Sequence, residues 1–161
     1  MFFDEEMMLD LRLNILDKYV DKFVINEATY MHSGKPKKLL FDINKYSKFK
    51  DKIIYNIVDK QPKEIEEIYE EDKDEFDTRG QKLARNSSRR EHFQRDSAME
   101  SIKEADPDDI ILINDVDEIP NLENFNFKKI NKKLIYFKQK MFFYKFNLLH
   151  EEINWVGSRA C

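Results

Sequence analysis

The pattern of apolar and polar residues predicts two helices. Within residues 5–18, one buried helical face would be formed by Met8, Leu9, Leu11, Leu13, Ile15 and Leu16. Asp4 stands at the position of an N-cap residue. Farther along, Ser88 and Glu91 have the spacing of a capping box, and the apolar stripe after them stops before Pro107. We therefore predict helices over residues 5–18 and 88–105.

Short runs rich in β-branched and aromatic residues predict the strands. These runs lie at residues 22–26, 52–58, 110–113, 133–138 and 141–146, and we expect the last two to form an antiparallel pair. Strands that alternate with helices indicate an α/β sheet, in which ligands usually bind beyond the C-terminal ends of parallel strands. This rule points to Glu27 and to residues 115–118.

The length and composition fit one globular domain. The 161 residues can form a single core, and we expect one domain over residues 1–161. Charged residues make up 37% of the chain, against about 25% in average proteins, so much of the chain must be solvated surface. Acidic residues dominate positions 63–77 and basic residues positions 79–95. We expect a charged, flexible excursion around residues 61–87, with a joint near Gly80.

Charge and cysteine content exclude several classes of protein. The net charge of -4 gives no overall attraction to nucleic acid or to an anionic membrane. Cys161 is the only cysteine, so neither an intrachain disulfide nor a cysteine metal cage can form. The acidic N-terminus lacks a secretory signal, and the apolar runs are far shorter than the roughly 20 residues that cross a bilayer. We expect a cytoplasmic protein without a membrane span or a nucleic-acid partner.

Three acidic residues, Asp115, Asp117 and Glu118, directly follow the predicted strand at residues 110–113. In an extended chain, residues i and i+2 face the same side, so Asp115 and Asp117 are expected to converge on one cation. Carboxylate oxygens suit Mg²⁺ or Mn²⁺, which keep coordination positions for substrate phosphates. An isolated Asp-x-Asp pair is more often a solvent-facing turn. Here the apolar strand before it and Pro120 after it favour a rigid site.

A basic segment, RREHFQR at residues 89–95, lies at the start of the second predicted helix. Arginine makes bidentate contacts with phosphate, and a helix N-terminus adds backbone donors and a favourable dipole. Arg90 and Arg95 are therefore candidate contacts for a diphosphate. For Arg89, a solvated basic face that answers the preceding acidic stretch is the better interpretation.

Two polar residues near the first strand are further candidates. Glu27, at the end of that strand, is placed to accept hydrogen bonds from hydroxyl groups of a ligand, although strand-end glutamates equally often face solvent. His32 has the chemistry of a metal ligand or a proton carrier, but a single histidine in a polar loop is usually a loop residue. Glu27 is therefore the stronger of the two candidates.

The C-terminal part of the chain contains candidates for binding and for base catalysis. Trp155 and Tyr144 offer aromatic faces on which a sugar ring can stack, although most aromatic residues of this kind lie in a core. Glu151 and Glu152 are candidates for the base that deprotonates a hydroxyl nucleophile, although adjacent acids are usually surface residues. Both interpretations remain open.

Several motifs, in this order along the chain, resemble glycosyltransferase family 17. That family includes the enzyme that adds the bisecting N-acetylglucosamine to the core β-mannose of N-glycans. The matching segments are FDE at 3–5, LDLRL at 9–13, VDKFVINE at 20–27, HSGKPK at 32–37, REHFQRD at 90–96 and DIILINDVDEIP at 109–120. The last segment is the most specific.

The resemblance implies an A-type glycosyltransferase fold, in which a Rossmann-like mixed sheet flanked by helices binds a nucleotide-sugar. It also implies a UDP-sugar donor, with N-acetylglucosamine as the expected sugar, a glycan or glycoconjugate acceptor, and inversion at the anomeric carbon. In this interpretation Asp117, assisted by Asp115, anchors Mn²⁺ or Mg²⁺ against the diphosphate. Arg90 and Arg95 assist the phosphates, and Glu27 orients the donor.

The family pattern extends beyond this chain at both ends. Only MFF remains of the first strand, and family members continue past residues 155–159, where acceptor binding and the catalytic base often lie. One alternative is therefore a fragment that binds the donor but lacks part of the catalytic machinery. A second is a metal-dependent phosphohydrolase, although its motif normally continues with Gly and Thr. A nucleic-acid-binding module that uses residues 79–95 is the weakest alternative, because the neighbouring acidic run opposes it.

Overall fold

The computed structural model describes residues 1–70, 72, 78–145 and 147–161. These residues form two compact units, where the sequence predicts one domain over residues 1–161. Unit 1 contains Met1–Asp4 and Lys22–Glu104, and unit 2 contains Glu5–Asp21 and Ala105–Cys161. Since each unit is built from two separate stretches of sequence, the chain passes from one to the other more than once.

Unit 1 is built on a pair of parallel strands. β1 (Phe23–Ala28) pairs with β2 (Ile53–Val58) in a register that runs from Phe23 opposite Ile53 to Ala28 opposite Val58. Both strands form where the sequence predicts them, at residues 22–26 and 52–58. The β-branched residues of each run favour the extended backbone, and the parallel pairing brings the ends of both strands to one edge.

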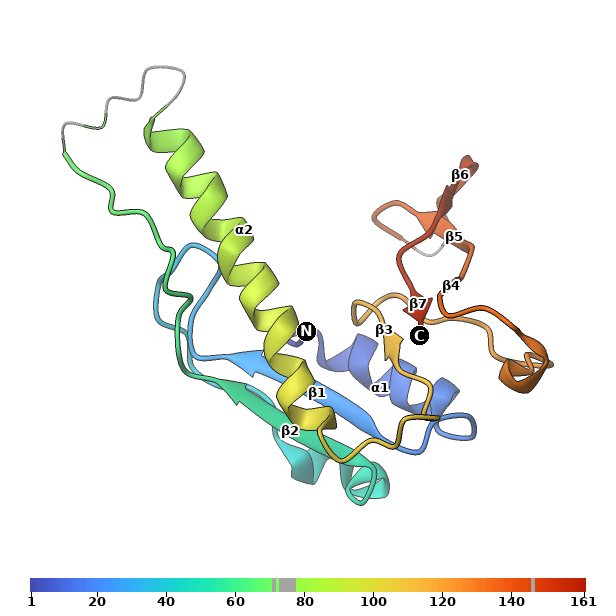
Figure 1. Cartoon of the computed structure of the whole chain (residues 1–161). Helices are drawn as coiled ribbons and strands as arrows, with labels where there is room; N and C mark the ends of the chain where they lie inside the picture. The colour runs from blue at the N-terminus through green and yellow to red at the C-terminus, as the bar shows by residue number, and fades with distance from the viewer. Residues whose placement is uncertain (71, 73–77, 146) are drawn as a thin grey trace. The chain divides into compact units, whose positions relative to one another are not determined.

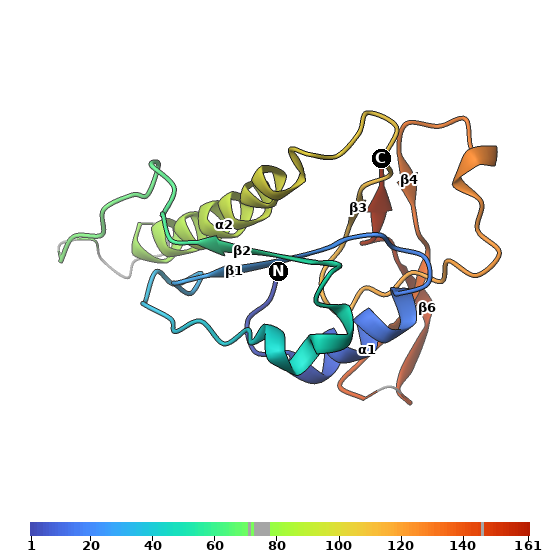
Figure 2. The ribbon, with the colours of Figure 1, turned by 90° about the horizontal axis from the view of Figure 1, so that it is seen from below.

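The long helix α2 (Arg79–Ser97) continues into the 3-10 helix η2 (Ala98–Ile102) and lies against the β1–β2 pair (Figures 1 and 2). The prediction that this helix starts at Ser88 is wrong, because the helix begins at Arg79 after its N-cap residue Thr78. The expected joint near Gly80 is also wrong, since Gly80 lies within the helix. The buried positions of α2 are polar, namely Asn86, Arg90 and Gln94, so the apolar pattern does not reveal its first half.

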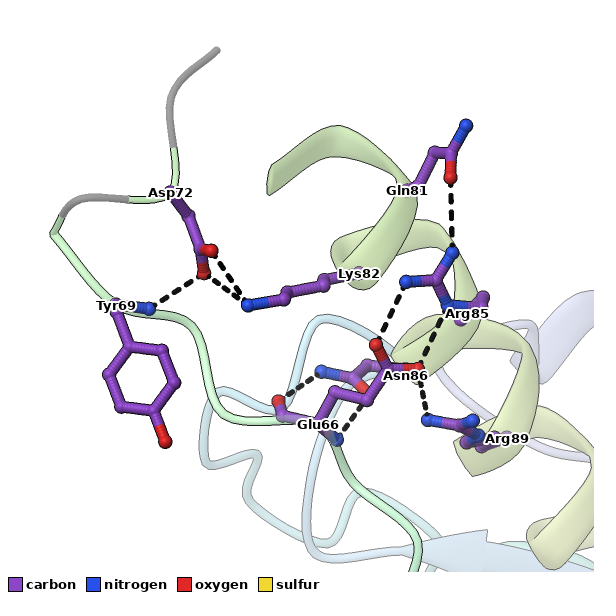
Figure 3. Close-up of polar contacts among 8 residues, drawn as sticks. All are labelled: Glu66, Tyr69, Asp72, Gln81, Lys82, Arg85, Asn86 and Arg89. Carbon is purple, nitrogen blue, oxygen red and sulfur yellow. Dashed lines mark hydrogen bonds and ion pairs between the residues drawn. The ribbon is translucent and has the colours of Figure 1, made fainter. Parts of the chain in front are cut away.

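The segment before α2 is tied to the helix by ion pairs (Figure 3). Glu66 accepts hydrogen bonds from the Nε and Nη2 atoms of Arg85, both at 2.8 Å, and from Arg89 at 2.6 Å. The hydrogen bonds from Arg85, together with that from Arg89, outweigh desolvation and lower the pKa of Glu66 to about 2. Lys82 pairs with Asp72 at 2.7 Å.

The prediction of a flexible excursion over residues 61–87 is therefore wrong for part of that stretch. Its last residues, from Arg79 onward, are helical, and the stretch around Glu66 is anchored to that helix rather than loose. Residues 71 and 73–77 of the predicted excursion lie outside the described residues.

The two faces of the β1–β2 pair carry different cores. On the face that packs against α2, Ala28, Tyr30 and Val58 form a buried cluster with Phe93. Elsewhere in unit 1, the ring of Phe41 contacts Phe2, Tyr46 and Tyr55 at centroid distances of 5.9, 5.5 and 4.7 Å. Tyr46 belongs to the 3-10 helix η1 (Ile43–Phe49). Alternate side chains of a strand face opposite sides, so one short pair of strands serves both clusters.

In unit 2, helix α1 (Glu6–Leu16) confirms the helix that the sequence predicts over residues 5–18. Its buried positions, Leu9, Leu13 and Leu16, are spaced three and four residues apart and so share one face. The prediction that Leu11 and Ile15 belong to this buried face is wrong, because both are exposed. The predicted N-cap is wrong: Glu5, not Asp4, is the N-cap residue, and its side chain makes no capping hydrogen bond. Burial of the three leucines stabilises the helix.

The strands of unit 2 form two small antiparallel sheets. In the first, β7 (Arg159–Ala160) lies between β3 (Leu112–Ile113) and β4 (Ile135–Tyr136); in the second, β5 (Gln139–Phe142) pairs with β6 (Leu149–Trp155). The 3-10 helix η3 (Phe127–Lys129) precedes β4. The expected pairing of residues 133–138 with 141–146 is wrong, because β4 and β5 have different partners. A two-residue strand such as β7 is too short to leave a periodic pattern.

The chain is thus an α/β protein, as predicted. Across the described residues, its strands form three sheets, each purely parallel or purely antiparallel, rather than one mixed sheet. Every described helix is too short or too polar to cross a bilayer.

Candidate functional site

The acidic residues after β3 form a tight turn rather than an extension of the strand. β3 ends at Ile113, and the backbone N–H of Glu118 donates a 3.2 Å hydrogen bond to the carbonyl of Asp115. The expectation that Asp115 and Asp117 project to one side as strand residues i and i+2 is therefore wrong. We call residues 115–118 the acidic turn.

Glu118 points into the protein. Only 7% of its surface is exposed, and its Oε2 atom accepts a 2.9 Å hydrogen bond from the backbone N–H of Asp115. Its other carboxylate oxygen accepts a hydrogen bond from the indole N–H of Trp155. Ser158, which is also buried, donates to the Glu118 carbonyl at 3.4 Å. Glu118 therefore closes the acidic turn from within.

Arg12, from helix α1, holds the same turn by its backbone. Its Nη1 atom donates to the carbonyl of Asp115 at 3.0 Å and to the carbonyl of Glu118 at 2.8 Å, and Nη2 donates to the side chain of Asn114. Burial lowers the pKa of Arg12 to about 10, while the carboxylates of Glu118, Asp115 and Asp117 act in the opposite direction. The guanidinium stays charged at neutral pH and lies against three acids.

The other two acids of the turn are more accessible to solvent than Glu118. Asp117 is exposed and Asp115 is partly exposed. In the described part of the chain, no three His, Cys, Asp or Glu side chains are grouped so as to hold a metal ion. One or two carboxylates together with substrate phosphates are a ligand set that Mg²⁺ commonly takes.

Glu27 is fully buried in unit 1, with 0% exposure. Its carboxylate accepts hydrogen bonds from Lys37, from the backbone N–H groups of Leu40 at 2.8 Å and Phe41 at 3.1 Å, and from Tyr55 at 2.7 Å. Burial alone would raise the pKa of Glu27, but these hydrogen bonds outweigh it and the pKa lies below its ordinary value. The solvent-facing alternative for this residue is wrong.

The basic candidates lie in the second half of α2, not at its N-terminus, so the argument from a helix dipole does not apply to them. Arg90 is only 8% exposed and donates to Gln61 at 2.8 Å and to the carbonyl of His32 at 3.1 Å. The Arg95 side chain is 27% exposed and pairs with Glu91 at 3.2 Å. Of the two arginines, Arg95 is the more accessible to a ligand.

Two weaker candidates in unit 1 also have internal partners. The Nε2 atom of His32 lies 3.2 Å from the side-chain oxygen of Gln94, and Arg89 is paired with Glu66. This pairing agrees with the interpretation of Arg89 as part of a basic face that answers the acidic stretch.

The candidate bases Glu151 and Glu152 are exposed in strand β6. The β5–β6 register shifts there: Lys140 lies opposite Asn154 and Met141 opposite His150, so residues 151–153 have no partner in that register. A bulge of this kind often changes the direction of side chains near functional sites.

The candidate stacking residues are not in a core. Tyr144 is 99% exposed and Trp155 is 47% exposed, so the interpretation of these two as core residues is wrong. The indole N–H of Trp155 binds Glu118, which links β6 to the acidic turn. Within unit 2, Trp155 and Asp115 therefore both donate hydrogen bonds to the Glu118 carboxylate. Glu151 and Glu152 lie on the same strand as Trp155.

In a comparison with models of protein families, the chain matches the family described as glycosyltransferase family 17 over residues 1–160. The chain belongs to glycosyltransferase family 17. No curated protein and no solved structure gives a significant match. The resemblance inferred from the motifs is therefore confirmed, and it covers residues of both units.

Membership of family 17 makes the protein a glycosyltransferase, with a sugar donor and an acceptor as its substrates. This activity class supports the transferase interpretation of the acidic turn over the phosphohydrolase alternative.

The sequence interpretation of this family 17 chain missed Arg12 and Lys37. One signal was present for Arg12, since it is a charged residue between the buried Leu9 and Leu13 on the apolar face of α1. An arginine at such a position usually has a buried acceptor. For Lys37, which pairs with Glu27, the loop sequence carries no comparable signal.

Proposed function

We propose that this protein is a metal-dependent, inverting glycosyltransferase that transfers N-acetylglucosamine from a UDP-sugar to a hydroxyl group of a glycan. We further propose that the complete nucleotide-sugar site has the A-type, Rossmann-like organisation. Membership of family 17 supports the activity class, and the acidic turn is the observation that carries the proposed metal dependence. The UDP-sugar donor, N-acetylglucosamine and inversion rest on the resemblance to that family.

In this proposal, the three acids of the turn have two different tasks. Glu118 faces inward and closes the turn, whereas Asp115 and Asp117 supply oxygens for Mn²⁺ or Mg²⁺. When bound, the cation would neutralise the charge that develops on the departing diphosphate. Asp117, the most exposed of the three, is its main protein ligand, and Asp115 assists.

The transfer itself requires a base. A carboxylate, Glu151 or Glu152, takes the proton of the acceptor hydroxyl while the hydroxyl oxygen attacks the anomeric carbon. The bond between that carbon and the UDP oxygen breaks on the opposite side, which inverts the configuration. Both glutamates are exposed, so an acceptor can reach them.

Of the residues of unit 1 predicted to bind the donor, Glu27, Arg90 and Arg95, we propose Arg95 as the direct contact. Their environments rank them: Glu27 and Arg90 are 0% and 8% exposed and engaged with internal partners, whereas Arg95 retains 27% side-chain exposure. We therefore expect substitution of Arg95 to weaken donor binding directly. Substitution of Glu27 or Arg90 would act mainly through the fold of unit 1.

Calorimetric titration with UDP-N-acetylglucosamine and UDP-glucose, with and without Mn²⁺, tests the proposal, together with a transfer assay on glycan acceptors. We expect Mn²⁺-dependent binding that Asp117→Asn abolishes and Asp115→Asn weakens. Asp108→Asn, which changes an exposed acid elsewhere in unit 2, is the matched control and should bind as the unaltered protein does. Binding of UDP-sugars without metal, or its absence in both conditions, would contradict the proposal. Metal-dependent binding without transfer would favour a donor-binding fragment.

A further inference from the structure

The side chains of Arg12, Glu118 and Trp155, none of them a predicted metal ligand, hold the acidic turn. We infer that Arg12 and Glu118 are positioning residues, which hold residues 115–118 in the conformation that presents Asp115 and Asp117 to the cation and the diphosphate. The inference rests on the proposed function, because it assigns the support of that same site. Trp155 completes the support by donating a hydrogen bond to Glu118, and Gly157 leaves the space for that contact.

Arg12 joins the two ends of the turn. A single nitrogen, Nη1, donates to the carbonyl of the first residue, Asp115, and to the carbonyl of the last, Glu118, at 3.0 and 2.8 Å. The other terminal nitrogen binds Asn114, the residue before the turn. A planar guanidinium can satisfy these three acceptors at once, and a lysine ammonium lacks that fork. The contacts therefore fix the backbone that carries both aspartates.

Glu118 clamps the turn through its side chain. One carboxylate oxygen binds the N–H of Asp115 at 2.9 Å and the other binds the indole N–H of Trp155. Because both oxygens already have partners in the protein and the residue is 7% exposed, Glu118 is not arranged as a cation ligand. Glu118 is therefore buried, whereas the adjacent residue, Asp117, is exposed to solvent.

Gly157 leaves the space that this clamp requires. A Cβ atom at this position would overlap the Glu118 carboxylate and the Trp155 indole nitrogen. Gly157→Ala would therefore displace the clamp without removing any charge or hydrogen-bonding group of the turn. The Gly157→Ala substitution therefore tests how the geometry of the turn affects metal binding without a change of charge.

Arg12 also offsets the mutual repulsion of the acids. Three carboxylates within four consecutive residues repel one another, and Arg12 attracts each of them. A turn that is already closed does not have to be ordered when the cation binds, which favours tight binding. Loss of either support should therefore weaken binding of metal and nucleotide together.

The test measures Mn²⁺ affinity in the presence of UDP, by electron paramagnetic resonance of free Mn²⁺, for Arg12→Gln, Arg12→Lys, Trp155→Phe and Gly157→Ala. We expect Arg12→Gln to weaken the affinity by roughly 10–100-fold, the usual effect of losing an outer-sphere partner, and Arg12→Lys to fall between it and the unaltered protein. Leu13→Ala is the control, because it shortens a buried apolar side chain of the same helix and removes no hydrogen bond or charge from the turn. Equal Mn²⁺ affinities for Arg12→Gln and Leu13→Ala would overturn the inference.

A second measurement does not depend on metal. Trp155→Phe keeps an aromatic ring but removes the N–H that binds Glu118, so amide hydrogen exchange at Asp115 and Glu118 should accelerate while exchange in α1 does not change. Unchanged exchange at both amides would overturn the clamp. If the unaltered protein binds no UDP with Mn²⁺, the proposed function fails, and this exchange experiment still decides whether the clamp exists.

Discussion

Lys37 and Glu27 form an ion pair in which the two side chains are only 5% and 0% exposed. The lysine comes from the loop after β1 and also donates to the carbonyl of Lys38 at 3.0 Å, while the glutamate receives further hydrogen bonds from Leu40, Phe41 and Tyr55. Glu27 thus brings residues 37–41 and strand β2 together around one carboxylate. Because the charge of Glu27 is buried, the folded conformation of the loop depends on the compensating charge of Lys37.

Lys37→Ala should therefore destabilise the protein strongly. It leaves the Glu27 carboxylate buried without its cationic partner, and breaking a buried pair in this way typically costs about 3–5 kcal/mol. Urea denaturation followed by circular dichroism measures the free energy of unfolding. The neighbouring Lys38 is exposed, so Lys38→Ala is the matched control and should change stability by no more than about 0.5 kcal/mol. Equal effects of the two substitutions would show that the pair is not buried as described.

The same carboxylate predicts how stability depends on pH. The pKa of folded Glu27 is below its ordinary value, because its hydrogen bonds outweigh burial. The folded state therefore favours the ionised form, and the resulting stabilisation is present above the unfolded pKa of about 4.3 and is lost as the pH falls through the lower folded pKa. Glu27→Gln lacks this contribution. We expect the difference in unfolding free energy between the two proteins to shrink between pH 5 and the acid limit of folding; a difference that grows on acidification would contradict the assigned direction.

Two glycines should respond to alanine in opposite ways. Gly34 has a φ of +87°, and a Cβ atom there would lie 2.7 Å from Nη2 of Arg90, so Gly34→Ala must strain the backbone and displace a buried arginine. The backbone alone should cost roughly 1–2 kcal/mol. Gly80 lies in α2 with no atom within 4 Å of its added Cβ, so Gly80→Ala should stabilise by at most about 1 kcal/mol. If Gly34→Ala and Gly80→Ala moved the melting temperature in the same direction, the different environments assigned to the two glycines would be wrong.

The parts of the fold that the sequence predicted are those with an apolar signal. Helix α1 buries Leu9, Leu13 and Leu16 at helical spacing, and β1 and β2 coincide with β-branched runs. In such segments, local preference and burial favour the same conformation. The paired acids at 115 and 117 were likewise visible as a motif, and the family match confirms the resemblance built on it.

The missed features depend on polar contacts between distant segments. Helix α2 buries Asn86, Arg90 and Gln94, which repeat every four residues but are polar, so a search for apolar stripes places the helix start too late. The conformation of the acidic turn depends on Arg12, more than 100 residues earlier. No local pattern around residue 115 contains that partner, which is why the sequence suggested an extended strand.

The choice between Glu151 and Glu152 as the base can be made by kinetics. Both are exposed in the part of β6 where the register with β5 shifts. If one of them removes the acceptor proton, its change to Gln should lower kcat by about 10²–10⁴-fold, the usual contribution of a general base, while the affinity for Mn²⁺ and UDP stays unchanged. The other substitution should have little effect. Glu123→Gln, at an exposed acid elsewhere in unit 2, is the control. Full activity of both Glu151→Gln and Glu152→Gln would place the base at another residue, and a loss of donor affinity would indicate a binding role instead.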